Sequence, residues 1–307
     1  MRATCLNTIL KLAEADPRVF FIGSDLGQNT MTAFAAAFPE RFFMEGISEQ
    51  HILGMAAGLA MEGKIPFVNT IASFLTRRCF EQTVLDLCLQ NLPVRLVGNG
   101  GGLVYGPLGP THQTVEDLAC FRALPHMTIL APADAVQMRR LMPLTLDWPG
   151  PVYIRLGKGH DPIVTAEDTP LAIGRAVPLR EGRDALIATT GICLGACLEA
   201  AELLAAQGLS AAVLHFPTVK PLDVEGLLAA VSPVRAVVTV EEHSVLGGLG
   251  GAVIEVLAEA GALSGRRIRR LGLPDVFADR YGSQAELLAH YGLTAKGVAD
   301  AVAALAA

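Results

Sequence analysis

Short apolar runs rich in β-branched and aromatic residues recur along the first half of the chain and predict strands. Longer amphipathic stretches lie between these runs and predict helices. Strands that alternate with helices are typical of a parallel sheet covered on both faces. The expected strands are 20–22, 42–44, 66–68, 94–97, 127–130 and 152–154, and the expected helices are 2–15, 48–61, 74–91, 114–124 and 134–146.

A second alternating series follows an irregular stretch, 157–183, which is rich in Pro, Gly and charge and is expected to be a linker. The pattern therefore predicts an α/β protein of two consecutive doubly wound domains with mostly parallel sheets, 1–165 and 166–307. Neither contains a Gly-x-Gly-x-x-Gly turn or a Walker-type lysine loop. In the second domain the expected strands are 185–188, 212–215, 236–240 and 268–271, and the expected helices lie near 193–207, 223–231, 248–260 and 285–305.

The composition raises the question of a membrane, because 51% of the 307 residues are hydrophobic and the mean hydropathy is +0.43. The longest apolar stretches are much shorter than a bilayer requires. We therefore expect a protein that does not enter membranes and that buries its apolar surface internally and in contacts between subunits. The charged residues Arg2, Lys11, Glu14 and Asp16 argue against a secretory signal.

The net charge indicates which kinds of partner to expect, and the cysteines indicate the cellular compartment. The net charge is −6 with no basic run, which argues against a nucleic-acid partner. Six cysteines lie in apolar segments without the spacing of a disulfide framework. Buried free thiols in a reducing cytosol are the simplest interpretation, so we expect a cytoplasmic protein.

One candidate catalytic residue, Glu49, stands where an expected strand gives way to an expected helix, in the run MEGISEQH at 44–51. Ser48 can serve as the N-cap, and a glutamate in the first turn complements the helix dipole. An isolated glutamate at such a place usually has only that role. The next turns are small and would let another helix approach closely, as at an interface between subunits; they contain Gly54, Ala56, Ala57 and Gly58.

A second candidate, His112, lies in a glycine-rich loop after the expected strand 94–97. The loop contains GNGGG at 98–102 and GPLGPTHQ at 106–113. Open α/β sheets bind ligands at such strand ends. A lone histidine more often has a structural role, but its place in this loop favours catalysis.

Several segments together resemble the transketolase family. The run 46–60 is similar to the signature of its pyrimidine-binding domain, and GPTHQ at 109–113 resembles its catalytic histidine loop, which 1-deoxyxylulose-5-phosphate synthases share. APAD at 131–134 and PVYIR at 151–155 match the later part of that domain. EEHSVLGGLG at 241–250 resembles the C-terminal domain common to transketolases and 2-oxoacid dehydrogenase β subunits. The match covers nearly the whole chain in family order and implies the C-terminal subunit of a split transketolase.

The resemblance implies roles at a thiamine diphosphate site. Glu49 corresponds to the glutamate that hydrogen-bonds the aminopyrimidine ring nitrogen and promotes the imino tautomer, which is acid–base catalysis transmitted through the cofactor. Phe74 falls where the family stacks an aromatic ring on the pyrimidine, although it could equally be a core residue. Asp25 matches an acidic position near the cofactor, but Asp after a strand is also ordinary turn chemistry. His112 is expected to hydrogen-bond the oxygens of the donor substrate.

The expected substrate contacts depart in part from the family's sugar-phosphate pattern. Leu108 stands where the family usually has an Asp that reads a sugar hydroxyl, and Gly100 stands where it has a phosphate-contacting histidine. A phosphate-contacting serine maps near Asn29. Arg2 and Arg155 fall where the family has two phosphate-binding arginines, and guanidinium forks suit phosphate, sulfonate or carboxylate. The resemblance thus implies two-carbon ketol transfer from a ketose with an anionic tail to an aldehyde, with a non-standard donor or acceptor.

A partner subunit is implied as well. Transketolases hold the diphosphate and its metal through an N-terminal domain with a Gly-Asp-Gly motif, which this sequence lacks. The resemblance therefore implies a separate N-terminal subunit that holds the diphosphate and Mg²⁺ or Ca²⁺, in at least a heterotetramer. His243 is expected to have a structural or interface role.

Two alternatives stay open: the β subunit of a 2-oxoacid or acetoin dehydrogenase, and a non-catalytic transketolase-like subunit. The GPTHQ loop favours a transketolase over the dehydrogenase. The combination of Glu49, Phe74 and His112 favours catalysis over a regulatory or scaffolding role. The residues do not identify the donor or the acceptor.

Overall fold

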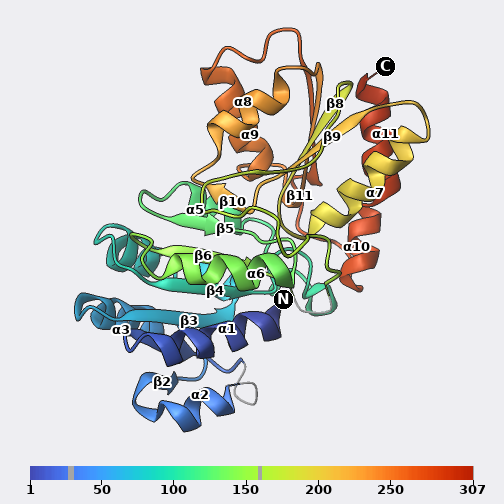
Figure 1. The fold of residues 1–307 in the computed structure, drawn as a ribbon. Helices are drawn as coiled ribbons and strands as arrows, with labels where there is room; N and C mark the ends of the chain where they lie inside the picture. The colour runs from blue at the N-terminus through green and yellow to red at the C-terminus, as the bar shows by residue number, and fades with distance from the viewer. Residues whose placement is uncertain (27–30, 158–160, 307) are drawn as a thin grey trace.

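The computed structural model describes residues 1–26, 31–157 and 161–306, which form two α/β units stacked along the long dimension of the molecule (Figure 1). The first unit contains a seven-stranded sheet in the order β10-β5-β6-β4-β3-β1-β2, and the second a five-stranded sheet in the order β12-β11-β8-β9-β7. Every pairing is parallel except those of β10 and β7. The predicted fold class is confirmed.

The six strands expected in the first half are present, and helices cover both faces of their sheet. One face packs against α3 and α5, and the other against α1, α2 and α6. Because both faces are covered, the central strands are buried along their whole length. The strands are β1 (Val19–Gly23), β2 (Phe42–Met44), β3 (Ile65–Ile71), β4 (Arg95–Asn99), β5 (Thr128–Leu130) and β6 (Val152–Leu156), and the helices are α1 (Arg2–Ala15), α2 (Thr32–Ala37), α3 (Glu49–Met61), α5 (Asp117–Arg122) and α6 (Ala135–Leu141).

The second sheet is covered in the same way, with α7, α10 and α11 packed on one face and α8 and α9 on the other. The stretch 285–305, expected as one helix, is divided at Gly292, whose φ of +73° ends α10. The strands are β7 (Val177–Arg180), β8 (Ala185–Thr189), β9 (Ala211–His215), β11 (Ala236–Ser244) and β12 (Arg267–Leu273), and the helices are α7 (Leu194–Ala205), α8 (Val224–Val231), α9 (Leu249–Glu259), α10 (Gln284–His290) and α11 (Ala295–Ala306).

Two strands depart from the sequence expectation. The stretch 157–183, expected to be irregular, contains β7, which pairs antiparallel with β9 at the edge of the second sheet. β10 (Thr218–Lys220) follows β9 in the chain but pairs antiparallel with β5 and so extends the first sheet. Each is an edge strand of three or four residues, too short to produce an alternation that can be recognised in the sequence.

The segment 74–91 is helical but not one regular α-helix. It consists of π-helical turns at Phe74–Arg78 and Thr83–Cys88 around α4 (Phe80–Gln82). The Thr76 and Thr83 hydroxyls each donate to the carbonyl oxygen four residues earlier, at 2.9 Å in both cases. In an α-helix these carbonyl oxygens accept backbone N–H groups. The threonine hydroxyls compete for the same acceptors, which is consistent with the wider π-helical turns.

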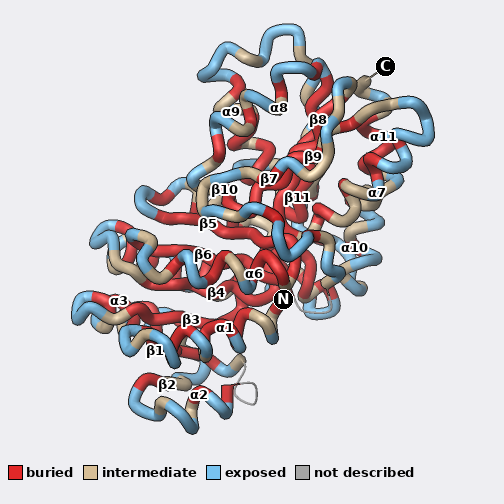
Figure 2. Tube along the Cα trace, in the orientation of Figure 1, coloured by how far each residue is buried: buried red, intermediate tan, exposed pale blue. Residues whose placement is uncertain are grey.

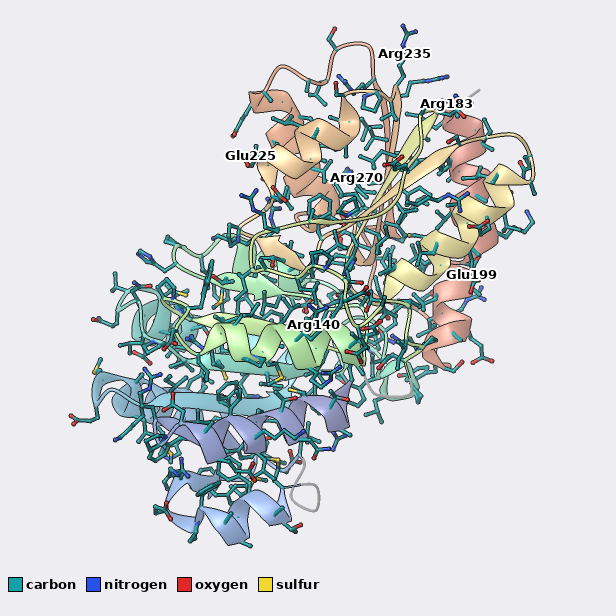
Figure 3. The ribbon with its side chains drawn as sticks, viewed as in Figure 1. Arg140, Arg183, Glu199, Glu225, Arg235 and Arg270 are labelled. Atoms are coloured by element: carbon teal, nitrogen blue, oxygen red, sulfur yellow. The ribbon has the colours of Figure 1, made fainter. Side chains whose placement is uncertain are left out.

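The buried residues follow the two sheets and continue across the junction between them (Figure 2). Leu103 and Ala133 of the first half belong to the apolar cluster of the second sheet. By contrast, Arg183, Glu225 and Arg235 are exposed on the periphery of the second unit (Figure 3). The two halves therefore share a core, and the loop that contains Leu103 is held between them.

Among the residues that the structure describes, no helix is both long enough and apolar enough to cross a bilayer.

Candidate active site

The carboxyl group of Glu49 is buried at the first turn of α3, with only 1% of the residue exposed. Its Oε2 accepts a hydrogen bond from Arg78 Nη1 at 2.5 Å, and its Oε1 is buried with no partner among the described residues. Ser48 occupies the N-cap position, but its hydroxyl donates to Glu45 O at 2.8 Å and does not cap the helix. A buried acceptor without a partner is unfavourable, so Oε1 is suited to a ligand that supplies a donor.

Successive contacts connect this carboxyl group to Arg78, Phe74 and His112. The Phe74 ring is half-buried, and its centroid lies 5.3 Å from that of His112 at an interplanar angle of 64°. The Arg78 guanidinium lies over the Phe74 ring, 4.4 Å from the centroid, while it pairs with Glu49. Arg78 therefore links the aromatic ring and the buried carboxylate. The structure brings the predicted residues Glu49, Phe74 and His112 into one site, and adds Arg78 to them.

The loop that contains His112 is held from both of its ends. Arg77 donates through Nη1 to Pro110 O at 2.9 Å and through Nη2 to Gln113 O at 2.8 Å, so its guanidinium brackets the dipeptide Thr111-His112. The Thr111 hydroxyl lies 2.9 Å from His112 Nδ1 and can fix one tautomer of the imidazole. Arg77 itself is held by an ion pair with Glu116. These bonds fix the position of the half-buried imidazole.

Tyr105 is a further member of the site that the sequence interpretation missed. Its ring centroid lies 6.4 Å from that of His112. Burial raises the pKa of the Tyr105 phenol, while the positive charge of Arg2 lowers it and the negative charge of Asp25 raises it, which places these two predicted residues near the phenol. A Cβ at Gly100 would lie 2.1 Å from the Tyr105 ring, so the ring fills the space beside this glycine. The sequence signal that could have identified Tyr105 was an aromatic residue inside a glycine-rich loop.

Arg78 and Arg77 were also missed. Both follow Phe74 within the segment 74–91, which the pattern predicts as helical. Residues three and four positions apart on a helix are neighbours, so this spacing was a signal for contact with Phe74. Arg78 bonds to Glu49, 29 residues away, and Arg77 bonds to the His112 loop, 33 residues away. A local sequence pattern does not predict contacts over such separations.

Arg155 lies apart from this group, in a buried network at the junction of the two units. Its Nε donates to Asp117 Oδ2 at 2.7 Å and its Nη2 to Asp117 Oδ1 at 3.1 Å. Nη2 also donates to Thr114 O and Glu242 O, at 3.1 and 2.9 Å. Burial alone would lower the pKa of Arg155, but the neighbouring Asp117 raises it above its ordinary value. The substrate contact expected of Arg155 stays a prediction, and it would require the guanidinium to share or leave Asp117.

The other predicted substrate residues lie nearer the surface. Leu108 is 52% exposed on a short 3-10 turn, Gly106–Leu108, and Arg2 is half-buried at the start of α1. Asp25 is exposed and accepts from the Ser24 hydroxyl at 3.1 Å. Asn29 lies outside the described residues. Leucine at 108 therefore presents an apolar surface in the loop of His112, where the expected family pattern has a carboxylate.

His243 has the interface role that the sequence favours. Its Nδ1 lies 2.7 Å from Ser244 O and its Nε2 accepts from the Ala119 backbone N–H at 3.3 Å. The side chain thus joins β11 to the start of α5.

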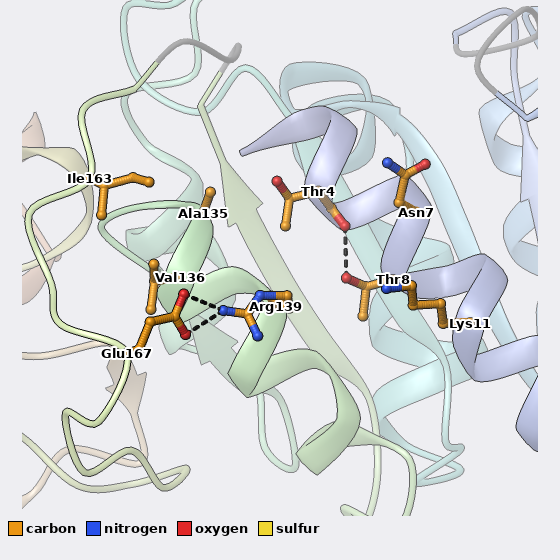
Figure 4. A pocket seen from close by; sticks show the side chains of 9 residues that line it. All are labelled: Thr4, Asn7, Thr8, Lys11, Ala135, Val136, Arg139, Ile163 and Glu167. Carbon is orange, nitrogen blue, oxygen red and sulfur yellow. Dashed lines mark hydrogen bonds and ion pairs between the residues drawn. The ribbon is translucent and has the colours of Figure 1, made fainter.

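A cavity of about 290 Å³ opens on a different part of the surface, between α1 and α6 (Figure 4). Its wall includes the exposed ion pair between Arg139 and Glu167 and the bond from the Thr8 hydroxyl to Thr4 O. None of the predicted site residues lines it. Within the described ranges, no group of three or more His, Cys, Asp and Glu side chains is arranged to hold a metal ion.

Comparison with protein families divides the chain into two parts, and β10 of the second part belongs to the first sheet. Residues 1–162 match the transketolase pyrimidine-binding domain, and residues 174–298 match the transketolase C-terminal domain. A 1-deoxy-D-xylulose-5-phosphate synthase of Symbiobacterium thermophilum is 42% identical over 97% of this chain, which spans 46% of that relative. The chain thus spans about half the length of the synthases that it matches.

Other relatives are of similar length to this chain. One of the subunits of an apulose-4-phosphate transketolase of Phocaeicola vulgatus is 37% identical over 97% of this chain and 94% of its own. The structure of a split-gene transketolase, described as an inactive β4 tetramer, superposes with a TM-score of 0.90 at 40% identity and covers 99% of this chain and 97% of its own.

Proposed function

This chain belongs to the transketolase family, and from that premise we propose that it is the catalytic C-terminal subunit of a split transketolase. In this proposal it transfers a two-carbon ketol unit from a ketose to an aldehyde, together with a separate subunit that holds the diphosphate of thiamine diphosphate and its Mg²⁺. The observation that carries the proposal is the buried Oε1 of Glu49, which has no partner among the described residues, in a carboxyl group that Arg78 connects to Phe74 and His112.

The residues of this chain fit the pyrimidine end of the cofactor. Glu49 has one oxygen held by Arg78 and the other without a partner among the described residues, so it can hold a proton at a ring nitrogen. Phe74 offers an aromatic surface for a flat heterocycle. When bound, thiamine diphosphate supplies a nucleophilic carbon for cleavage and formation of C–C bonds. The protein's contribution is to bind and orient the ring and to control the proton at Glu49.

His112 is suited to the donor's oxygens in this proposal. Its imidazole is half-buried next to Phe74, with Nδ1 at the Thr111 hydroxyl and the loop bracketed by Arg77. An imidazole held in place can accept a proton from a hydroxyl and return it later. Immobilising it before the substrate binds lowers the entropic cost of reaching the reactive geometry.

The donor's anionic tail is assigned to Arg2, a half-buried residue at the start of α1 whose positive charge lowers the pKa of the Tyr105 phenol. Phosphate and sulfonate are both compatible with a guanidinium fork. The transketolase relative named for apulose 4-phosphate supports a phosphorylated substrate. Leu108 supports an acceptor that differs from the usual hydroxy-aldehyde at the position this side chain faces.

A second candidate is supported by the identity to 1-deoxy-D-xylulose-5-phosphate synthases. Formation of 1-deoxy-D-xylulose 5-phosphate by the assembled enzyme would favour this candidate over ketol transfer.

The test is a transfer assay on the chain assembled with its diphosphate-binding partner, thiamine diphosphate and Mg²⁺. We expect conversion of a phosphorylated ketose and an aldehyde into a new ketose. Glu49→Gln should lower turnover by roughly 10²-fold or more, because an amide cannot hold and release the proton. The circular-dichroism band of the imino tautomer should disappear with it. Near-normal turnover of this variant, with the assembly intact, would refute the proposed role of Glu49.

A further inference from the structure

The loop with His112 is closed into a unit by its own backbone. Gly102 N donates to Thr114 O at 2.7 Å, and Thr114 N donates to Gly102 O at 2.9 Å. His112 is two residues from this closure. Any group that moves the paired residues therefore moves the imidazole as well.

The end of β11 in the second domain forms hydrogen bonds to the residues that follow Gly102 and Thr114 in the loop. Glu242 Oε1 accepts the backbone N–H of Leu103 at 2.9 Å, one residue beyond Gly102. The backbone N–H of Ser244 donates to Val115 O at 2.7 Å, one residue beyond Thr114. Arg155 supports the same place, since Nη2 donates to both Thr114 O and Glu242 O. The base of the loop is thus built partly from the second domain.

The carboxyl group of Glu242 is fixed in its turn. The residue is 3% exposed, and the same Oε1 accepts from Gln284 Nε2 at 2.7 Å at the start of α10. On the loop side, a Cβ at Gly102 would lie 2.3 Å from the Glu242 carboxyl carbon, and the φ of Gly102 is +75°. Only glycine fits there without moving the carboxylate or the loop. The loop sequence and Glu242 are therefore matched to each other.

We propose that Glu242 is a positioning residue for His112: it anchors the base of the loop through Leu103 N–H, so that the second domain determines where the imidazole lies. The inference rests on the role proposed above for His112. It also gives a function to the second domain. None of the predicted site residues lies there, because all of them fall within 2–155. Gln284 orients the anchoring carboxylate and shares its acceptor oxygen.

A purely structural contact between domains is the competing explanation, and Glu241 is the matched control for it. Glu241 is also buried, at 1% exposure, and accepts two backbone N–H bonds, from Leu249 at 2.7 Å and Gly250 at 2.9 Å. Those partners belong to α9 in its own domain. Replacing Glu241 therefore perturbs the second domain without releasing the loop.

The first measurement is hydrogen exchange on the full chain, without cofactor. Glu242→Leu removes both acceptor oxygens, so amides of 103–114 should exchange about 10-fold faster or more. Glu242→Gln keeps an acceptor for Leu103 N–H and should restore most of the protection. Glu241→Leu should leave this segment near the wild-type rate. Unchanged exchange of 103–114 in Glu242→Leu, or equal loosening in Glu241→Leu, overturns the proposal.

The second measurement is kcat/KM for the ketose donor in the assembled enzyme. Glu242→Leu should lower it by about 10- to 100-fold through misplacement of the imidazole, while the dissociation constant of thiamine diphosphate changes little. Because Glu242 acts through His112, the double variant Glu242→Leu/His112→Ala should be no worse than His112→Ala alone. Multiplying effects overturn the proposal. Full activity of His112→Ala instead removes the proposed role of His112, which separates the two failures.

Gln284→Ala is the second variant should Glu242→Leu fail to fold, because Gln284 is only half-buried on α10. It leaves the carboxylate in place but removes one of the two donors to its Oε1. A smaller acceleration of exchange, confined to 103–114, is the expected result. Wild-type exchange in this segment would show that Gln284 does not support the anchor and would count against the proposal.

Discussion

Burial and neighbouring charges together set the pKa values of Arg155 and Glu242. The Arg155 guanidinium keeps its charge because Asp117 lies beside it, at 2.7 Å between Nε and Oδ2. Burial raises the pKa of Glu242 from 4.5 to about 7, and the positive charge of Arg155 and the bonds from Gln284 and Leu103 oppose this rise. The pKa of each group is raised, which favours the charged form of Arg155 and the neutral form of Glu242.

Breaking the buried pair is expected to destabilise the fold. Arg155→Ala should lower the free energy of unfolding by about 3–5 kcal/mol, because Asp117 would be left as a buried charge without its partner. Urea unfolding of the full chain measures this change. Arg139→Ala is the control, since its pair with Glu167 is exposed and should contribute at most about 1 kcal/mol. Equal effects of the two substitutions would contradict the structural role of Arg155.

The same variant tests whether Arg155 also binds substrate. If its guanidinium contacts an anionic tail, Arg155→Ala should raise KM for a phosphorylated ketose about 10-fold or more, and for an uncharged ketose much less. Assays of both donors on variant protein that is still folded make the comparison. Equal rises in KM would exclude the anion contact and leave Arg155 to Asp117 alone.

Glu242 gives the stability of the chain a pH dependence. A carboxyl group with a raised pKa binds its proton more tightly in the folded state, so its contribution favours folding at low pH and is lost as pH rises from 4.5 through about 7. The full loss is about 3 kcal/mol. Groups near this carboxyl are Arg155, Asp117 and the buried thiol of Cys193. Glu242→Gln does not titrate at this position, so its stability lacks this pH dependence.

The comparison is made by urea unfolding between about pH 5 and about pH 8, which spans the shifted pKa. Relative to Glu242→Gln, the wild type should lose stability as pH increases through this window. Glu241→Gln is the control, which should retain the wild-type trend. Parallel curves for wild type and Glu242→Gln would mean that Glu242 is ionised in both folded and unfolded states throughout the window.

At the scale of elements, the π-helical turns and the glycine-rich loop form one unit. The turn Phe74–Arg78 presents Phe74 and Arg78 to Glu49, while Arg77 reaches the loop at Pro110 and Gln113. Single π-helical turns often occur at functional sites because they change which side chains face a neighbour. Here the turn supplies both the predicted ring-binding residue and the brace for the predicted catalytic histidine.

Replacing the brace should affect catalysis more than stability. Arg77→Lys keeps the charge but loses the planar fork that spans two carbonyls, so we expect kcat/KM for the donor to fall by roughly 10-fold or more. The change in unfolding free energy should stay within about 1 kcal/mol, because the Arg77 side chain is 37% exposed. Kinetics and urea unfolding measure the two effects. Arg139→Lys, on the surface by the cavity of Figure 4, is the control and should change neither.

At the scale of the whole molecule, the proposed function requires a second chain. In that proposal Glu49, Phe74 and His112 bind a heterocycle and a donor substrate, and the described residues contain no metal-binding cluster. A diphosphate requires charge neutralisation that a glutamate and an aromatic ring do not provide. This supports the proposal that the diphosphate and its metal are held by a separate partner chain.

Cofactor binding should therefore depend on the partner. Titration calorimetry of the isolated chain with thiamine diphosphate and Mg²⁺ should show weak binding or none. Addition of the diphosphate-binding partner should give tight binding that EDTA abolishes. Tight binding by the isolated chain would contradict the split-site model.

The sequence determined the two α/β layers because hydrophobic periodicity is local. All ten strands expected from apolar runs are present, because the alternation of apolar residues is a property of each segment and not of its distant partners. Its motifs also located Glu49, Phe74 and His112, which the fold brings together although 63 residues of sequence separate the first from the last. Their assigned roles stay predictions until the variants are measured.

Tertiary structure decided the features that depend on partners distant in sequence. The short edge strands β7 and β10 form because existing sheets offer unpaired edges, not because of their own pattern. Arg155 resembles an anion-binding residue in sequence, but its contact with Asp117 across 38 residues fixes it in a buried network. Glu242 meets Leu103 across 139 residues, and no local pattern encodes that contact. Burial and long-range hydrogen bonding thus determined which charged groups are fixed in networks inside the protein.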